Sequence, residues 1–194
     1  GTSSNYYAKV TMKPGVEKAA YGAVTVDGDK DAVWDNAGTI PITINLGSNV
    51  SANAKLLWDK DNFYVYAEIK DPVLNNTNGD AWEQDSLEVF IDENNGKSNS
   101  YEDDDKQYRI SYVNDHSFNG KKCLEENMKS VAKITSDGYV VEASFKWTDI
   151  TPKAGDEIGL EFQINDADAS GKRIGTLSWN DETGMGWSKP EVFG

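Results

Sequence analysis

Short segments of alternating apolar and polar residues run through most of the chain. The clearest lies at residues 86–92, where Leu87, Val89 and Ile91 occupy every second position. Successive side chains of a β-strand point to opposite faces, so this spacing predicts a strand with one buried face. Glu88 lies near the middle of the segment, on the other face.

The same pattern, with turn-forming residues between the segments, predicts about ten strands. Polar runs at 59–62 and 136–138 are typical of hairpin turns. Helical patterns are weak, and we expect only a turn at 125–130 and a short 3₁₀ piece at 147–150. Many short strands favour an all-β fold, an antiparallel, jelly-roll-like β-sandwich with minimal helix. The predicted strands are residues 24–27, 40–46, 54–58, 63–70, 86–92, 108–113, 131–135, 139–147, 158–165 and 175–179.

The 194 residues are most simply one domain, because no Pro- or Ser-rich segment divides them. We expect residues 1–5 to be a linker remnant and residues 6–194 to form a single β-sandwich domain. A run of about 18 apolar residues is absent from the sequence, which argues against a transmembrane helix. No signal peptide is visible.

The net charge of −14 changes this picture by limiting the partners. It argues against nucleic acid and against anionic membranes, both of which attract basic surfaces. It is compatible with calcium binding and with solubility. The single cysteine, Cys123, excludes an internal disulfide and does not fix the compartment.

Three predicted strands carry polar residues opposite their apolar faces: Glu88, Arg109 and Gln163. If the strands are neighbours, these side chains meet on one surface, where Arg and Glu orient each other and Gln both donates and accepts. The alternative is a cross-strand salt bridge on a solvated sheet face. A carboxylate near an indole ring suits a sugar, because the ring covers C–H groups and the carboxylate accepts bonds from hydroxyls.

The six tryptophans are a high load for a polar, acidic chain. Trp82 and Trp179 lie at strand ends, where exposure is as plausible as packing. Trp34, Trp58 and Trp147 fit a core, and Trp187 is ambiguous.

Oxygen-rich segments offer candidate calcium ligands, since calcium takes six to eight oxygens. Two acidic loops stand out, 92–96 and 102–105, and Asp71 and Asp27 are weaker candidates of the same kind. The spacing does not match an EF-hand, and a solvated acidic run is the alternative.

Other chemistry finds little support. His116 is the only histidine, which nearly excludes a His-based zinc site, and it has no nucleophile motif beside it. A small glycoside hydrolase with two acids remains an alternative, although the strand faces offer one Glu with an Arg and a Gln. A haem-binding electron-transfer sandwich is a second alternative, in which Met12, Met128 or Met185 would accompany His116.

From about Ala20 to the C-terminus, the chain resembles carbohydrate-binding module family 9, particularly the modules appended to xylanases. The ordered matches lie at residues 26–28 with Trp34, and at 57–59, 70–75, 82–86, 90–95, 101–105, 163–167 and 178–179.

The resemblance implies a β-sandwich with structural calcium and a slot in which two Trp rings enclose the sugar at a reducing end. Trp82 and Trp179 match the rings, and Glu88, Arg109 and Gln163 match the residues that bind hydroxyls. Ser111 stands where close members carry an Asn that reaches the ligand. The candidate calcium ligands are Asp27, Asp71, Asp92, Asp103, Asp104 and Asp105. The resemblance fixes them less than the sugar-binding residues, because carbonyl ligands leave no mark in a sequence.

We therefore expect a secreted, monomeric and non-catalytic module, covalently attached to a xylanase or another glycoside hydrolase. Its expected ligands are the chain ends of cellulose and xylan and small sugars such as glucose, xylose and cellobiose.

Overall fold

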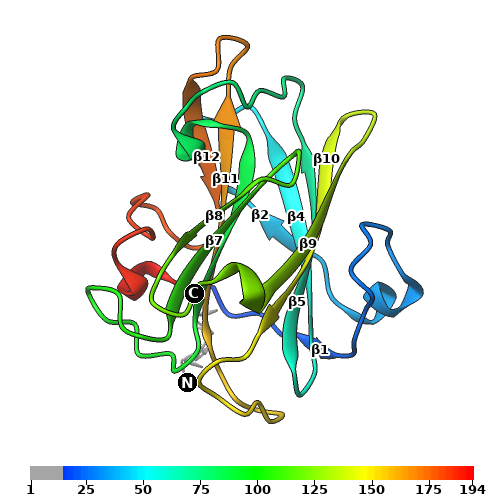
Figure 1. The fold of residues 1–194 in the computed structure, drawn as a ribbon, viewed down its shortest axis with the longest axis vertical. Helices are drawn as coiled ribbons and strands as arrows, with labels where there is room; N and C mark the ends of the chain where they lie inside the picture. The colour runs from blue at the N-terminus through cyan, green and yellow to red at the C-terminus, as the bar shows by residue number, and fades with distance from the viewer. Residues whose placement is uncertain (1–14) are drawn as a thin grey trace, which may run out of the picture.

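The computed structural model describes residues 15–194, and the predicted linker remnant at residues 1–5 lies outside them. Two six-stranded sheets face each other (Figure 1). The first sheet has the order β1-β4-β5-β10-β9, with β2 also paired to β4. Its strands are β1 (Ala20–Tyr21), β2 (Ile40–Ile42), β4 (Ser51–Trp58), β5 (Asn62–Lys70), β9 (Met128–Ile134) and β10 (Gly138–Lys146).

The second sheet has the order β3-β12-β11-β6-β7-β8. Its strands are β3 (Ile44–Leu46), β6 (Ser86–Asp92), β7 (Asp105–Ser111), β8 (His116–Asn119), β11 (Gly159–Ala167) and β12 (Arg173–Ser178). All pairings between strands are antiparallel except β1 with β4. The helical elements of residues 15–194 are four 3₁₀ turns, η1 (Ala32–Asn36), η2 (Ala81–Glu83), η3 (Glu125–Asn127) and η4 (Pro190–Val192). The predicted β-sandwich is confirmed.

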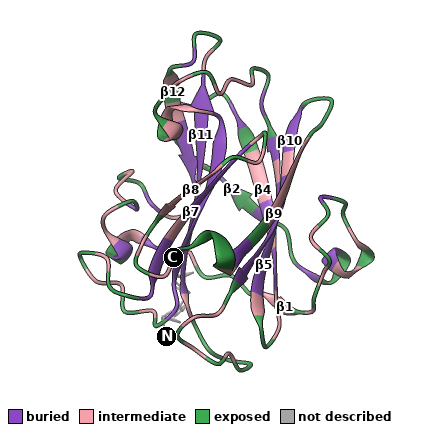
Figure 2. Ribbon diagram, in the orientation of Figure 1, coloured by how far each residue is buried: buried purple, intermediate pink, exposed green. Residues whose placement is uncertain are grey.

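The core lies between the sheets, where the apolar sides of the alternating strands meet. Leu87, Val89 and Ile91 are buried there, as their spacing predicted. Figure 2 shows the strands largely buried and the loops largely exposed. Each buried strand stabilises the fold through the apolar area that it removes from water.

Four predicted elements differ in the structure. Residues 40–46 form two strands, since the chain crosses from the first sheet (β2) to the second (β3). Residues 24–27 form no strand, because that segment runs over the outside of the first sheet as a loop. The turn expected at 125–130 is η3 followed by the start of β9, and residues 147–150 form bends without a 3₁₀ turn.

Within residues 15–194, no helix has the length and apolarity needed to span a membrane.

Candidate functional site

The outer face of the second sheet carries the three predicted polar residues side by side. The register pairs Glu88 of β6 with Arg109 of β7 on one side and with Gln163 of β11 on the other. All three are buried, and Glu88 is only 3% exposed. The structure therefore brings together the trio that the alternation placed on one face.

Glu88 is held by amides and forms no direct ion pair with any residue between 15 and 194. Gln107 and Gln163 each donate from Nε2 to Glu88 Oε2 at 3.2 Å. Arg109 Nη2 instead donates to Gln84 Oε1 at 2.8 Å, and its buried Nε has no partner among the described residues. The alternative of a simple salt bridge on a wet face does not describe this arrangement.

Burial raises the pKa of Glu88 above its usual value. Hydrogen bonding from Asn165 and Gln107 and the charges of Arg109 and Arg173 act in the opposite direction. A buried carboxylate of this kind favours a ligand that donates hydrogen bonds to it, because such bonds replace the water that burial removes.

A cavity of about 400 Å³ opens over Glu88 and Gln163, whereas Arg109 lies beside it and does not line it. This volume is within the range of small-molecule sites. The cavity is lined by Trp82, Glu88, Gln107, Gln163, Arg173, Thr176, Gly184 and Trp187. Trp82 and Trp187 are 48% and 57% exposed, whereas the other four tryptophans are buried or half-buried. Large exposed rings beside a polar floor are typical of a binding surface.

The first ring is positioned by bonds from β12 and β11 to the loop that precedes β6. Glu83 accepts a hydrogen bond from the backbone N–H of Arg173 at 2.6 Å. The Arg173 guanidinium lies 4.7 Å from the centroid of the Trp82 ring. Asp85 accepts from the N–H of Ala167 at 2.7 Å. These contacts hold η2, and Trp82 with it, against the sheet.

The second ring belongs to the segment after β12, which one buried carboxylate fastens to the sheet. Glu161 accepts hydrogen bonds from the N–H groups of Phe162, Trp179, Asn180 and Asp181 at 2.8–3.1 Å. Burial raises the pKa of Glu161 to about 7, and these backbone bonds oppose that rise.

Asp181 also stabilises this segment, because it accepts hydrogen bonds from the N–H groups of Thr183 and Gly186 at 2.7 and 3.0 Å. Asn119 donates to the carbonyl of Trp187 at 3.1 Å. Trp187 is thereby held beside the cavity by the contacts of the residues that precede it and by the bond to its own carbonyl.

Trp179, the second ring expected from the sequence, does not line the cavity. It follows Ser178, which pairs with Gln163 on the outer face, so alternation turns Trp179 toward the core. Its ring packs edge-on against Phe162, with centroids 6.4 Å apart. The ring that faces the cavity is Trp187.

Ser111 also lies away from the cavity. It is buried, and its Oγ accepts from the N–H groups of Val113 and Asp115 at 3.3 and 3.0 Å. It therefore supports the turn between β7 and β8.

Sequence reasoning missed Gln107, Arg173, Thr176 and Gly184 as lining residues. Gln107 could have been predicted from the sequence, because it precedes Arg109 by two positions and shares its face. Thr176 pairs with Asn165, two residues after Gln163, but this pairing needs the β11–β12 register.

Two groups of buried carboxylates lie outside the cavity. Asp92, Asp104 and Asp105 bring one oxygen each within 4.8 Å of one another, and so do Asp71, Asp85 and Asp166. Asp105 Oδ1 and Asp71 Oδ2 are buried without a hydrogen-bond partner in the described residues. Burial raises the pKa of Asp105 to about 7 and that of Asp85 to about 8. Partnerless oxygens among mutually repelling carboxylates fit a calcium ion.

The remaining calcium candidates are placed elsewhere. Asp103 is exposed and pairs with Lys121 at 2.5 Å. Asp27 is exposed and accepts from the N–H of Asp29 at 2.9 Å. Neither joins a carboxylate group among the described residues. Asp85 and Asp166, which do, were not predicted.

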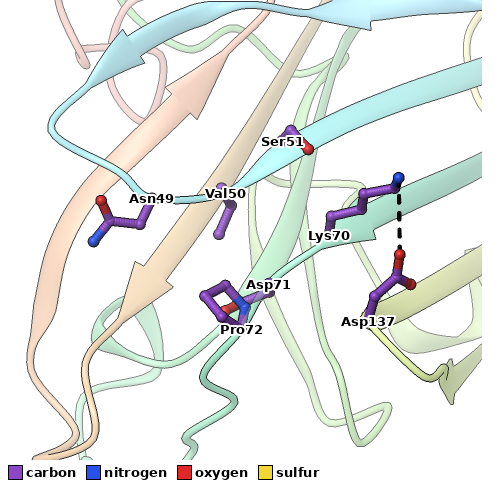
Figure 3. A pocket seen from close by; sticks show the side chains of 7 residues that line it. All are labelled: Asn49, Val50, Ser51, Lys70, Asp71, Pro72 and Asp137. Atoms are coloured by element: carbon purple, nitrogen blue, oxygen red, sulfur yellow. Dashed lines mark ion pairs between the residues drawn. The ribbon is translucent and has the colours of Figure 1, made fainter.

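A second hollow of about 430 Å³ lies beside Asp71, between the ends of β4 and β5 (Figure 3). Lys70 and Asp137 form an ion pair there at 3.8 Å. No aromatic ring lines it, so it lacks the stacking surface of the first cavity.

The haem alternative has no support in the geometry of His116. Its Nδ1 contacts Glu125 at 2.9 Å and its Nε2 contacts Ser130 at 2.7 Å. Met128 is buried in the core, and Met12 lies outside the described residues.

Comparisons with known proteins agree with the fold. A model of the family described as carbohydrate family 9 binding domain-like matches residues 26–194. The chain is similar to a family 9 carbohydrate-binding module from Caldicellulosiruptor kristjanssonii, solved with cellotriose and with glucose. For the cellotriose complex the TM-score is 0.87 and the identity 37%, over 91% of this chain and 89% of the other.

Longer relatives contain the same region. The chain is 44% identical over 183 residues to endo-1,4-beta-xylanase A of Thermotoga neapolitana, which covers 92% of this chain. It is 41% identical over 197 residues to exoglucanase XynX of Acetivibrio thermocellus, which covers 100% of it. The chain spans only 17% and 18% of these relatives' lengths.

The fold and these matches define a carbohydrate-binding module. The chain belongs to carbohydrate-binding module family 9. It is a non-catalytic binding domain, and the predicted family and class are confirmed.

Proposed function

We propose that the cavity binds the reducing end of a β-linked glucan or xylan chain between Trp82 and Trp187. The observation that carries this proposal is the pair of exposed indole rings lining one cavity with the buried Glu88. Each ring covers one face of a pyranose, and Glu88, Gln163 and the nearby Arg109 bind its hydroxyls. The related module solved with cellotriose and glucose supports the ligand class.

A slot closed on two sides favours a chain end over the middle of a chain. Stacking contributes about 1–3 kcal/mol per ring, and charge-assisted hydrogen bonds about 1.5–3 kcal/mol each. After the entropy of association is offset, binding of small sugars is expected in the micromolar to millimolar range.

Isothermal titration with glucose, xylose and cellobiose tests the proposal. Trp82→Ala and Trp187→Ala should each weaken cellobiose binding by about tenfold or more. Tyr21→Ala is the matched control, because Tyr21 is a 67% exposed ring on the other sheet. Unchanged affinity in either Trp variant would refute the two-ring slot. Equal affinity for cellobiose and its methyl β-glycoside would refute recognition of the reducing end.

Two carboxylate groups are proposed to hold structural calcium, one at Asp92, Asp104 and Asp105 and the other at Asp71, Asp85 and Asp166. Bound calcium would supply positive charge that relieves the repulsion among these buried acids. Prolonged EDTA treatment should lower the melting temperature, and added calcium should restore it. The Asp27→Asn variant should respond as the natural chain does, since Asp27 joins neither group. A melting temperature that EDTA leaves unchanged contradicts this proposal.

The setting of the module is a proposal of the same kind. The matched relatives are longer enzymes of which this chain spans a small part. We propose that it is secreted as one domain of a polysaccharide-degrading enzyme and directs the attached catalytic domain to plant cell-wall chain ends. The module itself is proposed to act as a monomer.

A further inference from the structure

Arginine is unevenly placed in this acidic molecule. The chain has only two arginines, and both lie at the candidate site. Arg109 is paired in register with Glu88, and Arg173 lines the cavity itself. The net charge of the whole chain is −14, so this concentration of arginine sets the cavity apart from the surface around it.

Arg109 and Glu88 offset each other. They are adjacent across β6 and β7, both are buried, and the Arg109 charge favours the ionised form of Glu88. Glu88 is the only acidic side chain among the lining residues of the cavity. The charge of Arg173 also acts on Glu88. Two arginines therefore face one carboxylate, and the site carries one positive charge in excess.

The contacts of Arg173 leave much of its guanidinium free. Its Nη1 donates to Asn165 Oδ1 at 3.1 Å and to the carbonyl of Trp82 at 3.5 Å. Its Cζ lies over the Trp82 ring, 4.7 Å from the ring centroid, a cation–π contact that restricts the side chain. No protein acceptor among residues 15–194 takes a bond from Nε or Nη2, and no ion pair is formed within 4.0 Å. A planar guanidinium with free donors suits a carboxylate, which it can bind through two parallel bonds.

We infer that Arg173 gives the cavity affinity for sugars that carry a carboxylate. This inference rests on the proposed sugar-binding function and deepens it by naming an acidic class of ligand. Two kinds of sugar have this chemistry, a uronic acid with the carboxylate on C6 and an aldonic acid with the carboxylate on C1. The negative charge of the rest of the chain opposes such ligands, but salt screens distant charges over about 8 Å at physiological ionic strength.

Titration calorimetry of the natural chain with glucose, glucuronate and cellobionate tests this inference. Glucuronate or cellobionate should bind at least as tightly as glucose, and the tighter of the two identifies the position of the carboxylate. Raising the sodium chloride concentration from 0.15 to 0.5 M should weaken binding of the acid more than binding of glucose.

Variants assign the effect to Arg173. Arg173→Met keeps an unbranched apolar side chain of similar reach, and it should raise the Kd for the preferred acid at least ten times more than the Kd for glucose. Arg173→Lys, which keeps the charge but loses the planar fork, should restore part of the loss. Lys172→Met is the matched control, because it removes the same charge from an exposed neighbour, and it should leave both affinities unchanged.

Three results would overturn the inference. The natural chain could bind glucose but bind both acids more than ten times more weakly. Arg173→Met could raise the Kd values for acid and glucose by the same factor, or Lys172→Met could act as Arg173→Met does. Absence of binding to glucose, xylose, cellobiose and both acids would overturn the proposed function, and this inference with it.

Discussion

A loop segment covers part of the outer face of each sheet, and in both cases a buried glutamate of the sheet binds it. The tryptophan of the first segment is buried, whereas that of the second is exposed. On the first sheet, the loop between β1 and β2 is fastened by Glu142, which is fully buried. Glu142 accepts from the N–H groups of Asp27 and Gly28 at 2.8 and 3.1 Å and from Trp34 Nε1 at 2.8 Å. Trp34 is 0% exposed and packs on Tyr66, with ring centroids 5.6 Å apart.

On the second sheet, the C-terminal segment is fastened by Glu161, which is 1% exposed. Here the carboxylate accepts only backbone N–H groups, and the tryptophan of the segment, Trp187, remains more than half exposed. In Figure 1 the two segments lie on opposite outer sides of the sandwich, blue over one sheet and red over the other. The difference teaches that the same kind of buried glutamate can serve two purposes. Glu142 holds a tryptophan that covers the first sheet, and Glu161 holds a segment whose tryptophan stays exposed for a ligand.

The largest expected effect that separates the two faces is on stability at Trp34. Trp34→Ala removes a fully buried ring and leaves one Glu142 oxygen without its donor, so it should lower the free energy of unfolding by about 3–5 kcal/mol. Its affinity for glucose, measured below the melting transition, should stay unchanged because Trp34 lies on the other sheet. Urea unfolding and calorimetry of the same preparation provide both values.

Trp187→Ala is the counterpart of Trp34→Ala, and we expect it to affect affinity and not stability. It should weaken sugar binding and alter the free energy of unfolding by less than about 1 kcal/mol, because the ring is exposed. A large loss of stability from Trp187→Ala, or of affinity from Trp34→Ala, would break the comparison.

Removing the two glutamates gives a smaller but sharper contrast. Glu142→Ala and Glu161→Ala each leave several buried N–H groups unpaired, and each should cost about 2–4 kcal/mol of stability. Only Glu161→Ala should also weaken glucose binding, by about fivefold or more, since it frees the segment that carries Trp187. The two Kd values, measured at a temperature where both variants are folded, decide the matter. Equal Kd values for both variants and the natural chain would show that Glu161 does not position Trp187.

The sequence predicted the floor of this site better than its walls. Glu88, Arg109 and Gln163 follow from period-two alternation, because register pairs residues on one face once the strands are neighbours. That neighbourhood itself came from the family resemblance. The same alternation also indicates that Trp179 points toward the core, because Trp179 falls on the same face as the buried Leu177.

The residues beside the cavity and in the carboxylate groups were harder to predict, because they lie outside the regular alternation of the strands. Trp187 lies in an irregular segment held by Glu161 and Asp181, so its exposure depends on contacts across the fold. The carboxylate group of Asp71, Asp85 and Asp166 gathers residues from the ends of three segments. Such long-range convergence leaves no local pattern to read.

A further expected effect concerns the proton on Glu161. Its pKa lies near 7 in the folded chain against an ordinary value of 4.5, so the folded state binds more protons than the unfolded state between these pH values. The free energy of unfolding should therefore fall as the pH rises from 4.5 toward 7, by at most about 3 kcal/mol from this group. Glu161→Gln cannot titrate, so its profile should be flatter over the same interval. Urea unfolding at pH 5.0 and 7.5 in excess calcium measures the difference, and the buried aspartates, common to both chains, cancel from it. Parallel profiles would show that Glu161 keeps an ordinary pKa, with its four backbone bonds outweighing the cost of burial.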